Sequence, residues 1–97
     1  MTLPFDEDDR ALFTVGQVAE MLHVQPAFVR RLDVEQVIQP ARSPGGQRRY
    51  TRAEVLLVQQ VAQMADEGMS LPGIRRILSL QAEVAELQRQ LDRRKGH

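Results

Sequence analysis

The sequence predicts a mainly α-helical fold with one small β-hairpin and a long last helix. Two short amphipathic helices follow each other closely between Thr14 and Asp33. A glycine-containing hairpin with arginines on both arms comes next, and a heptad repeat of apolar residues lies near the C-terminus. Together these features predict a winged helix-turn-helix, with the hairpin as the wing, followed by a C-terminal coiled-coil helix for dimerisation.

The composition is that of one small domain. The chain has 97 residues, enough for three or four helices around a modest core. It contains no cysteine, which excludes disulfides, thiolate zinc sites and iron–sulfur clusters. His23 and His97 lie too far apart in the chain to form a metal site together. Because no apolar run is long enough to span a membrane and the first ten residues are acidic, we expect a cytoplasmic protein with no cofactor and no membrane contact.

The net charge of zero conceals an uneven distribution of charge. Residues 1–10 hold four acidic residues and one arginine, a balance of −3, and we expect residues 1–12 to form an acidic disordered arm. Residues 39–53 hold four arginines and no acidic residue, a balance of +4. Because phosphate recognition depends on local clusters of charge, this basic segment is a candidate contact for nucleic acid.

The first two helices are predicted from a capping box and a proline. Thr14 and Gln17 form a T-x-x-Q box that opens a helix ending near His23. Pro26 is favoured in the first turn of a second helix, which we expect to span about 26–33. Its buried face would carry Phe28, Val29 and Leu32, which leaves Gln25, Ala27, Arg30 and Arg31 outside. An ordinary helical corner has the same pattern, so the pair alone does not establish DNA binding.

The hairpin gives the stronger indication. Val37 and Ile38 predict a short strand, and residues 40–50 then read P-A-R-S-P-G-G-Q-R-R-Y. The Pro-Gly-Gly segment suits a hairpin tip, and it is flanked by Arg42, Arg48 and Arg49. Since arginine holds phosphate oxygens with its planar fork, we interpret the hairpin as a wing that follows a phosphate backbone. The alternative is a solvated surface loop. We expect Tyr50 to pack the hairpin against the helices.

Two further helices complete the chain. Thr51 and Glu54 form a second capping box, opening a helix over about 52–67 that ends before Gly68. Its expected buried stripe is Val55, Leu56 or Val58, Ala62, and Met64 or Ala65, with Gln59 at the edge. Ser70 would cap the last helix, whose apolar residues are spaced 3, 4, 3, 4: Ile77, Leu80, Val84, Leu87 and Leu91. Such a helix cannot bury this seam alone, so we expect a second copy to cover it; folding back onto the head is the alternative.

In this order, the segments resemble the MerR superfamily of transcription regulators, and within it the heat-shock repressor (HspR) branch. The resemblance runs from Phe13 to about Leu91. It is carried by T-V-G-Q-V-A-E-M-L in the first helix, G-G-Q-R-R-Y with T-R-A-E-V at the wing, and E-G-M-S-L-P-G-I-R-R-I-L-S-L beyond it. There are departures: Arg31 and Leu32 replace an aromatic pair in the recognition helix, and Gln36 stands where a glycine is normal.

The resemblance implies a homodimer held by antiparallel C-terminal helices, with recognition helices in successive major grooves of promoter DNA. It also implies a protein associated with the bacterial nucleoid that represses heat-shock or chaperone genes, with a chaperone as co-regulator. Because only a few residues follow Leu91, we expect no small-molecule effector. The expected organisation is a disordered arm (1–12), a DNA-binding domain (13–79), and a dimerisation helix with a basic tail (80–97). The residues expected to contact DNA are Thr14, Gln25, Ala27, Arg30, Arg31, Arg42, Arg48, Arg49 and Tyr50, and those expected at the dimer interface are Ile77, Leu80, Val84, Leu87 and Leu91.

Two other functions fit parts of the pattern. A chaperone modulator that binds a J-domain co-chaperone would suit the coiled coil, but it has no need of arginines around a glycine hairpin. An architectural DNA binder related to excisionases would lack the coiled-coil seam. An enzyme is not expected, because there is no cysteine, no histidine beside a carboxylate cluster and no glycine loop between a strand and a helix.

Overall fold

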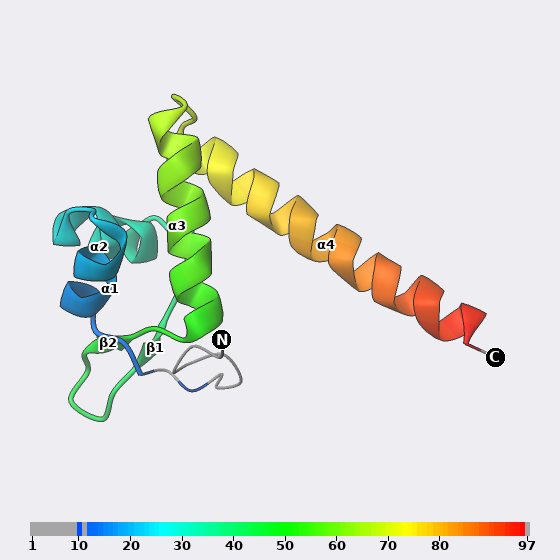
Figure 1. Ribbon diagram of the computed structural model, residues 1–97, viewed down its shortest axis with the longest axis horizontal. Coiled ribbons are helices and arrows are strands. Elements are labelled where there is room, and N and C mark those ends of the chain that lie inside the picture. The colour runs from blue at the N-terminus through cyan, green and yellow to red at the C-terminus, as the bar shows by residue number, and fades with distance from the viewer. Residues whose placement is uncertain (1–9, 11, 97) are drawn as a thin grey trace.

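The computed structural model describes residue 10 and residues 12–96, so most of the expected acidic arm lies outside the described residues. The described chain forms a small helical head from which one long helix projects (Figure 1). Its order is α1 (Val15–Leu22), α2 (Pro26–Val34), β1 (Ala41–Arg42), β2 (Arg48–Arg49), α3 (Arg52–Asp66) and α4 (Leu71–Lys95). This confirms the predicted fold class. No described helix combines the length and the apolar character that crossing a membrane requires.

Side-chain caps set the starts of three helices. The Thr14 hydroxyl accepts a hydrogen bond from the Gln17 amide at 3.1 Å, and the Gln17 side chain accepts one from the Thr14 amide at 2.9 Å. Thr51 and Glu54 form the same reciprocal pair at the start of α3. The Ser70 hydroxyl accepts from the Gly73 amide at the start of α4. Each cap satisfies amides that have no partner inside the helix, and all three were predicted.

The hairpin is short and antiparallel, with Ala41 opposite Arg49 and Arg42 opposite Arg48. Gly46 adopts a positive φ of 84° at its tip, a conformation that a side chain would strain. The strand expected at Val37 and Ile38 is wrong. Both amides bind the carbonyl of Leu32 at the end of α2, so they close that helix instead of joining a strand.

One hydrophobic core joins the helices and the base of the hairpin. On α3 the buried stripe is Val55, Val58 and Val61. Of the two alternatives in the sequence, Val58 was right and Leu56, which is 45% exposed, was wrong; Val61 was not expected. Ala62, Met64 and Ala65 are half-buried at the margin and Gln59 is exposed. The buried apolar residues are Val18, Ala19, Val29, Leu32, Ile38, Tyr50, Val55, Val58, Val61, Leu71 and Ile74.

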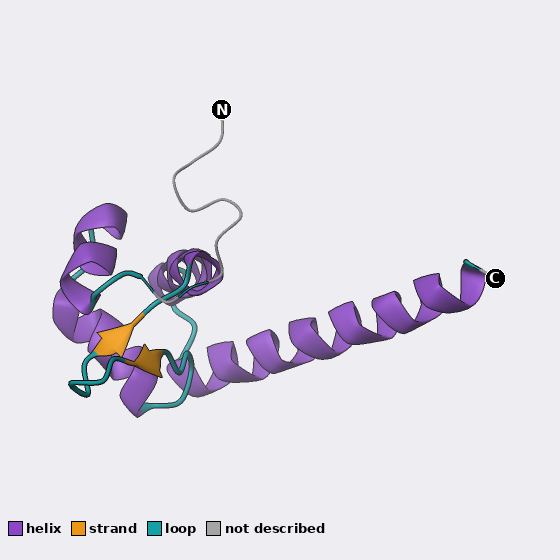
Figure 2. Cartoon of the chain, turned by 90° about the horizontal axis from the view of Figure 1, so that it is seen from below, coloured by secondary structure: helices purple, strands orange, loops and turns teal. Residues whose placement is uncertain are grey.

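Helix α4 is continuous over 25 residues and leaves the head after its first turns (Figure 2). Leu71 and Ile74 are buried in the core, and the Gln60 side chain donates to that of Gln81 at 3.1 Å, which ties α3 to α4. Beyond Gln81 the helix packs against no described part of the head, so Val84, Leu87 and Leu91 do not fold back onto it. The expected boundary between residues 79 and 80 falls inside this helix and marks no break in it.

Candidate nucleic-acid interface

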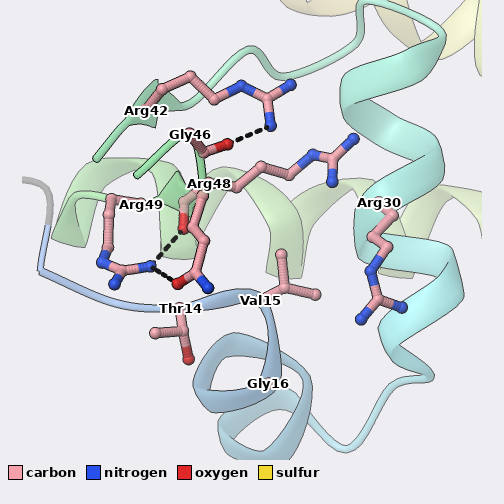
Figure 3. A pocket seen from close by; sticks show the side chains of 9 residues that line it. Thr14, Val15, Gly16, Arg30, Arg42, Gly46, Arg48 and Arg49 are labelled. Atoms are coloured by element: carbon pink, nitrogen blue, oxygen red, sulfur yellow. Dashed lines mark hydrogen bonds between the residues drawn. The ribbon is translucent and has the colours of Figure 1, made fainter. Parts of the chain in front are cut away.

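A hollow of about 360 Å³ lies where the hairpin, the start of α1 and helix α2 meet (Figure 3). Four arginines surround it, three from the hairpin and one from α2, and none of its lining residues is acidic. The lining residues are Thr14, Val15, Gly16, Arg30, Arg42, Gly46, Gln47, Arg48 and Arg49. The hollow is therefore strongly cationic.

The start of α1 forms one wall of the hollow. The first amides of a helix have no acceptor within it, and the helix dipole places partial positive charge at this end. Gly16 lies in this first turn and has no side chain to cover the backbone, so an anion can approach it closely. The Thr14 hydroxyl is engaged in the capping box, so its contribution here is to fix the first turn.

The hairpin arginines are held in place by hydrogen bonds. One terminal nitrogen of Arg49, Nη1, donates to the Gln47 side chain and to the Arg48 carbonyl, both at 3.2 Å. Arg42 Nη1 lies 3.5 Å from the Gly46 carbonyl oxygen. The Asp33 carboxylate binds two of the hairpin arginines: Arg48 Nε lies 2.6 Å and Arg42 Nη2 lies 2.8 Å from the same Oδ2 atom. Asp33 was not among the expected site residues, because nothing in the local sequence marks it.

Helix α2 presents a separate exposed face. Ala27, Arg30 and Arg31 are exposed on it, as expected, and Arg30 also reaches the hollow. Arg31 instead forms an ion pair with Glu35 one turn further along. Gln25 is the N-cap residue of α2 but makes no side-chain capping bond, and it lines a different hollow with His23 and Phe28, so the structure does not place it with the arginines.

Tyr50 does not belong to this surface. Its side chain is 1% exposed and lies in the core, so the expectation that it contacts DNA is wrong. The expectation that it packs the hairpin against the helices is confirmed. Burial raises the pKa of the Tyr50 phenol, and the nearby Arg48 partly offsets that effect.

The expected dimer seam is exposed along α4. Leu80, Val84, Leu87 and Leu91 are between 45% and 63% exposed, and Ile77 is half-buried. Ile77, Leu80 and Val84 line an apolar groove of about 470 Å³ together with Gln81, Ala85 and Gln88. A contiguous row of exposed apolar residues of this kind is a candidate interaction surface. The described residues hold no cluster of three histidines or carboxylates that could bind a metal ion.

Comparison with known proteins gives consistent results. The family described as "MerR HTH family regulatory protein" matches residues 13–81. The chain is 35% identical over 82 residues to a protein of Streptomyces coelicolor described as "Putative heat shock protein HspR". That alignment covers 84% of this chain and 54% of the relative, so the chain spans about half of its length.

Two solved structures share the fold. A transcriptional regulator of the MerR family from Bacillus cereus superposes with a TM-score of 0.62 at 22% identity, covering 81% of this chain and 65% of that one. HiNmlR, described as a MerR family regulator that lacks the sensor domain and is bound to promoter DNA, gives a TM-score of 0.61 at 25% identity, covering 82% of each chain.

Proposed function

This chain belongs to the MerR HTH family of regulatory proteins, and on this basis we propose that it regulates transcription by binding promoter DNA as a homodimer. The cationic hollow is the observation that supports this most directly. Arginine forks and the amides of a helix N-terminus both bind phosphate, and they converge there without an acidic lining residue. Similarity to a regulator described as bound to promoter DNA supports the same function.

The two surfaces of the head suit different parts of a duplex. In this proposal Arg42, Arg48 and Arg49 contact the phosphate backbone and fix the position of the protein on it. The exposed face of α2, with Ala27, Arg30 and Arg31, enters the major groove and reads base edges. Residues 13–79 then serve as the DNA-binding domain.

In this proposal the C-terminal helix forms the dimer interface. Residues 80–97 pair through the apolar seam with the same helix of another chain. Burying two exposed apolar faces against each other lowers the free energy of the system. A two-fold dimer requires two half-sites in the DNA, related by the same symmetry. The antiparallel arrangement is the one that the MerR resemblance implies.

We further propose that the regulated genes belong to the heat-shock or chaperone response, that the effect is repression, and that a chaperone acts as co-regulator. The 35% identity to a protein described as a putative heat shock protein HspR supports this assignment. A map of genomic binding sites with and without heat stress tests it. Occupied sites at promoters unrelated to that response would contradict it.

Affinity for duplex DNA tests the central proposal. Duplexes that bind the protein are enriched from a random library. The recovered duplex and a shuffled duplex of equal length are then titrated by fluorescence anisotropy over a salt series. We expect tighter binding of the recovered duplex and a log affinity that falls linearly with log salt. No affinity for any duplex at low salt would overturn the proposal and favour a chaperone modulator that binds a J-domain protein.

A further inference from the structure

Asp33 connects the recognition helix to the wing. It lies in the last turn of α2, and its side chain is only 12% exposed. Its Oδ2 atom accepts from Arg48 Nε at 2.6 Å and from Arg42 Nη2 at 2.8 Å. The two arginines lie opposite each other on β1 and β2, so one carboxylate binds both arms of the hairpin.

The wing needs a stabilising contact of this kind. A two-stranded hairpin with two residues on each strand has little stability of its own. A largely buried carboxylate is costly to desolvate unless it is paired and hydrogen-bonded, and Asp33 meets both conditions through these arginines. The contact therefore fixes the direction of the wing relative to α2.

The geometry also leaves Arg48 able to bind a second anion. A guanidinium has five N–H donors, and Arg48 uses Nε for Asp33. Its terminal nitrogens can donate to a phosphate while Nε stays on the carboxylate. The single carboxylate neutralises only one of the two guanidinium charges, so the Asp33, Arg42 and Arg48 cluster keeps a net charge of about +1.

We propose that Asp33 is a positioning residue that makes DNA binding selective. It orients Arg48 and the wing so that they contact phosphates when α2 is bound to its preferred base sequence. It also lowers the electrostatic attraction of the two arginines for duplex DNA of any sequence. The inference rests on the proposed DNA-binding function and assigns to Asp33 the coupling between base reading and phosphate contact.

Asp33→Asn tests the inference. Without the carboxylate, Arg42 and Arg48 together carry one more net positive charge that can neutralise phosphate. We expect the affinity for the shuffled duplex to rise and its salt slope to steepen by about 0.9 per protomer. We also expect the ratio of affinities, recovered over shuffled duplex, to fall by roughly threefold to tenfold, as for two coupled contacts. Anisotropy titrations across a salt series measure all three.

Two further variants separate positioning from charge. Glu20→Gln removes the same charge from the head, but Glu20 is exposed on α1 and does not line the cationic hollow, so the ratio should stay at the wild-type value. Asp33→Glu retains the carboxylate and should restore the ratio and the slope toward wild type. A ratio that is unchanged in Asp33→Asn, or lowered equally in Glu20→Gln, would overturn the inference.

The outcomes remain distinct from those of the proposed function. If the wild type binds no duplex, the proposed function fails; if it binds and Asp33→Asn keeps the ratio, only the role of Asp33 fails. Thermal unfolding of each variant shows whether it folds. Should Asp33→Asn not fold, Arg42→Gln carries the test, because Arg42 is 49% exposed. The substitution removes the ion pair between Asp33 and Arg42 and should lower the ratio of affinities, recovered over shuffled duplex. An equal loss of affinity for both duplexes would overturn the inference.

Discussion

Phe13 and Tyr50 pair through both of their backbone polar groups. The Tyr50 amide donates to the Phe13 carbonyl at 2.7 Å, and the Phe13 amide donates to the Tyr50 carbonyl at 3.0 Å. This isolated antiparallel bridge holds the residue before the cap of α1 against the residue after β2. The start of α1 and the wing arginines are therefore neighbours, which creates the cationic hollow. The Tyr50 side chain anchors the same junction in the core.

Tyr50→Phe should make the protein less sensitive to alkaline pH. Burial raises the pKa of Tyr50 above its ordinary value of 10.0. The unfolded chain therefore loses the phenolic proton first, and the free energy of unfolding falls as the pH rises from about 10 through the folded-state pKa. The hydroxyl has no hydrogen-bond partner among the described residues, so at neutral pH the variant should equal the wild type or exceed it by up to about 1 kcal/mol.

Urea unfolding near neutral pH and above about pH 10 measures this difference. Tyr50 is the single tyrosine of the chain, so tyrosinate absorbance reports its ionisation directly. Tyr50→Ala, which also removes the packing, should instead cost about 3–5 kcal/mol at every pH. An equal alkaline loss in the wild type and in Tyr50→Phe would contradict the prediction.

Gln36→Gly should stabilise the protein. Gln36 has a positive φ of 59°, a left-handed conformation that costs a non-glycine residue about 1 kcal/mol. Glycine removes that cost but loses more chain entropy, so we expect a net gain of roughly 0.5 kcal/mol. Gln39→Gly is the matched control, because Gln39 is exposed in the same loop and has no positive φ. It should lower the melting temperature, whereas Gln36→Gly should raise it; a fall in both would be the contrary result.

Arg30→Ala should weaken binding and relax sequence preference. Arg30 is the exposed residue of α2 that also reaches the cationic hollow. Arginine with two hydrogen bonds to guanine is worth about 1–3 kcal/mol of discrimination between bases. Selection of binding sites with the variant should therefore return a less stringent motif. The same motif at the same stringency would exclude Arg30 as a base reader.

Arg49→Ala is the matched control for this measurement. Arg49 lies on β2, and its side-chain hydrogen bonds among the described residues stay within the hairpin. A residue that contacts only phosphate should weaken recovered and shuffled duplexes alike and lower the salt slope by about 0.9 per protomer. A change of motif with Arg49→Ala would show that the two arginines are not functionally separate.

The local features of the sequence predicted most of the fold. The capping boxes at Thr14 and Thr51 involve residues three apart, so the sequence alone identifies both partners. The position of the hairpin tip also follows from local chemistry, because Gly46 supplies the positive φ that the turn requires. The valine stripe of α3 was only partly predicted, since the pattern V-L-L-V allows more than one buried face.

The tie between Asp33 and the wing could not be predicted in this way. Asp33 and Arg48 are fifteen residues apart, and their contact depends on how the chain turns after α2. That turn uses a left-handed glutamine, Gln36, and two amides that bind back to Leu32. The sequence instead suggested a strand at 37–38, so the turn itself was not predicted. Long-range ion pairs follow from such turns and leave no local pattern.

Leu87→Asp should convert the proposed dimer to a monomer. Leu87 is 57% exposed in the apolar seam of α4, so the single chain tolerates a charge there, whereas a paired interface would bury that charge at a cost of several kcal/mol. Ala82→Asp is the matched control: Ala82 is exposed on α4 and lies about 200° from Leu80 and Val84 around the helix, away from the seam. Sedimentation over a concentration series should show a dimer for the wild type and Ala82→Asp but a monomer for Leu87→Asp. Because two recognition helices bind two half-sites together, Leu87→Asp should also lose affinity for the recovered duplex while its head stays folded. A wild type that is already monomeric at every concentration would reject the homodimer.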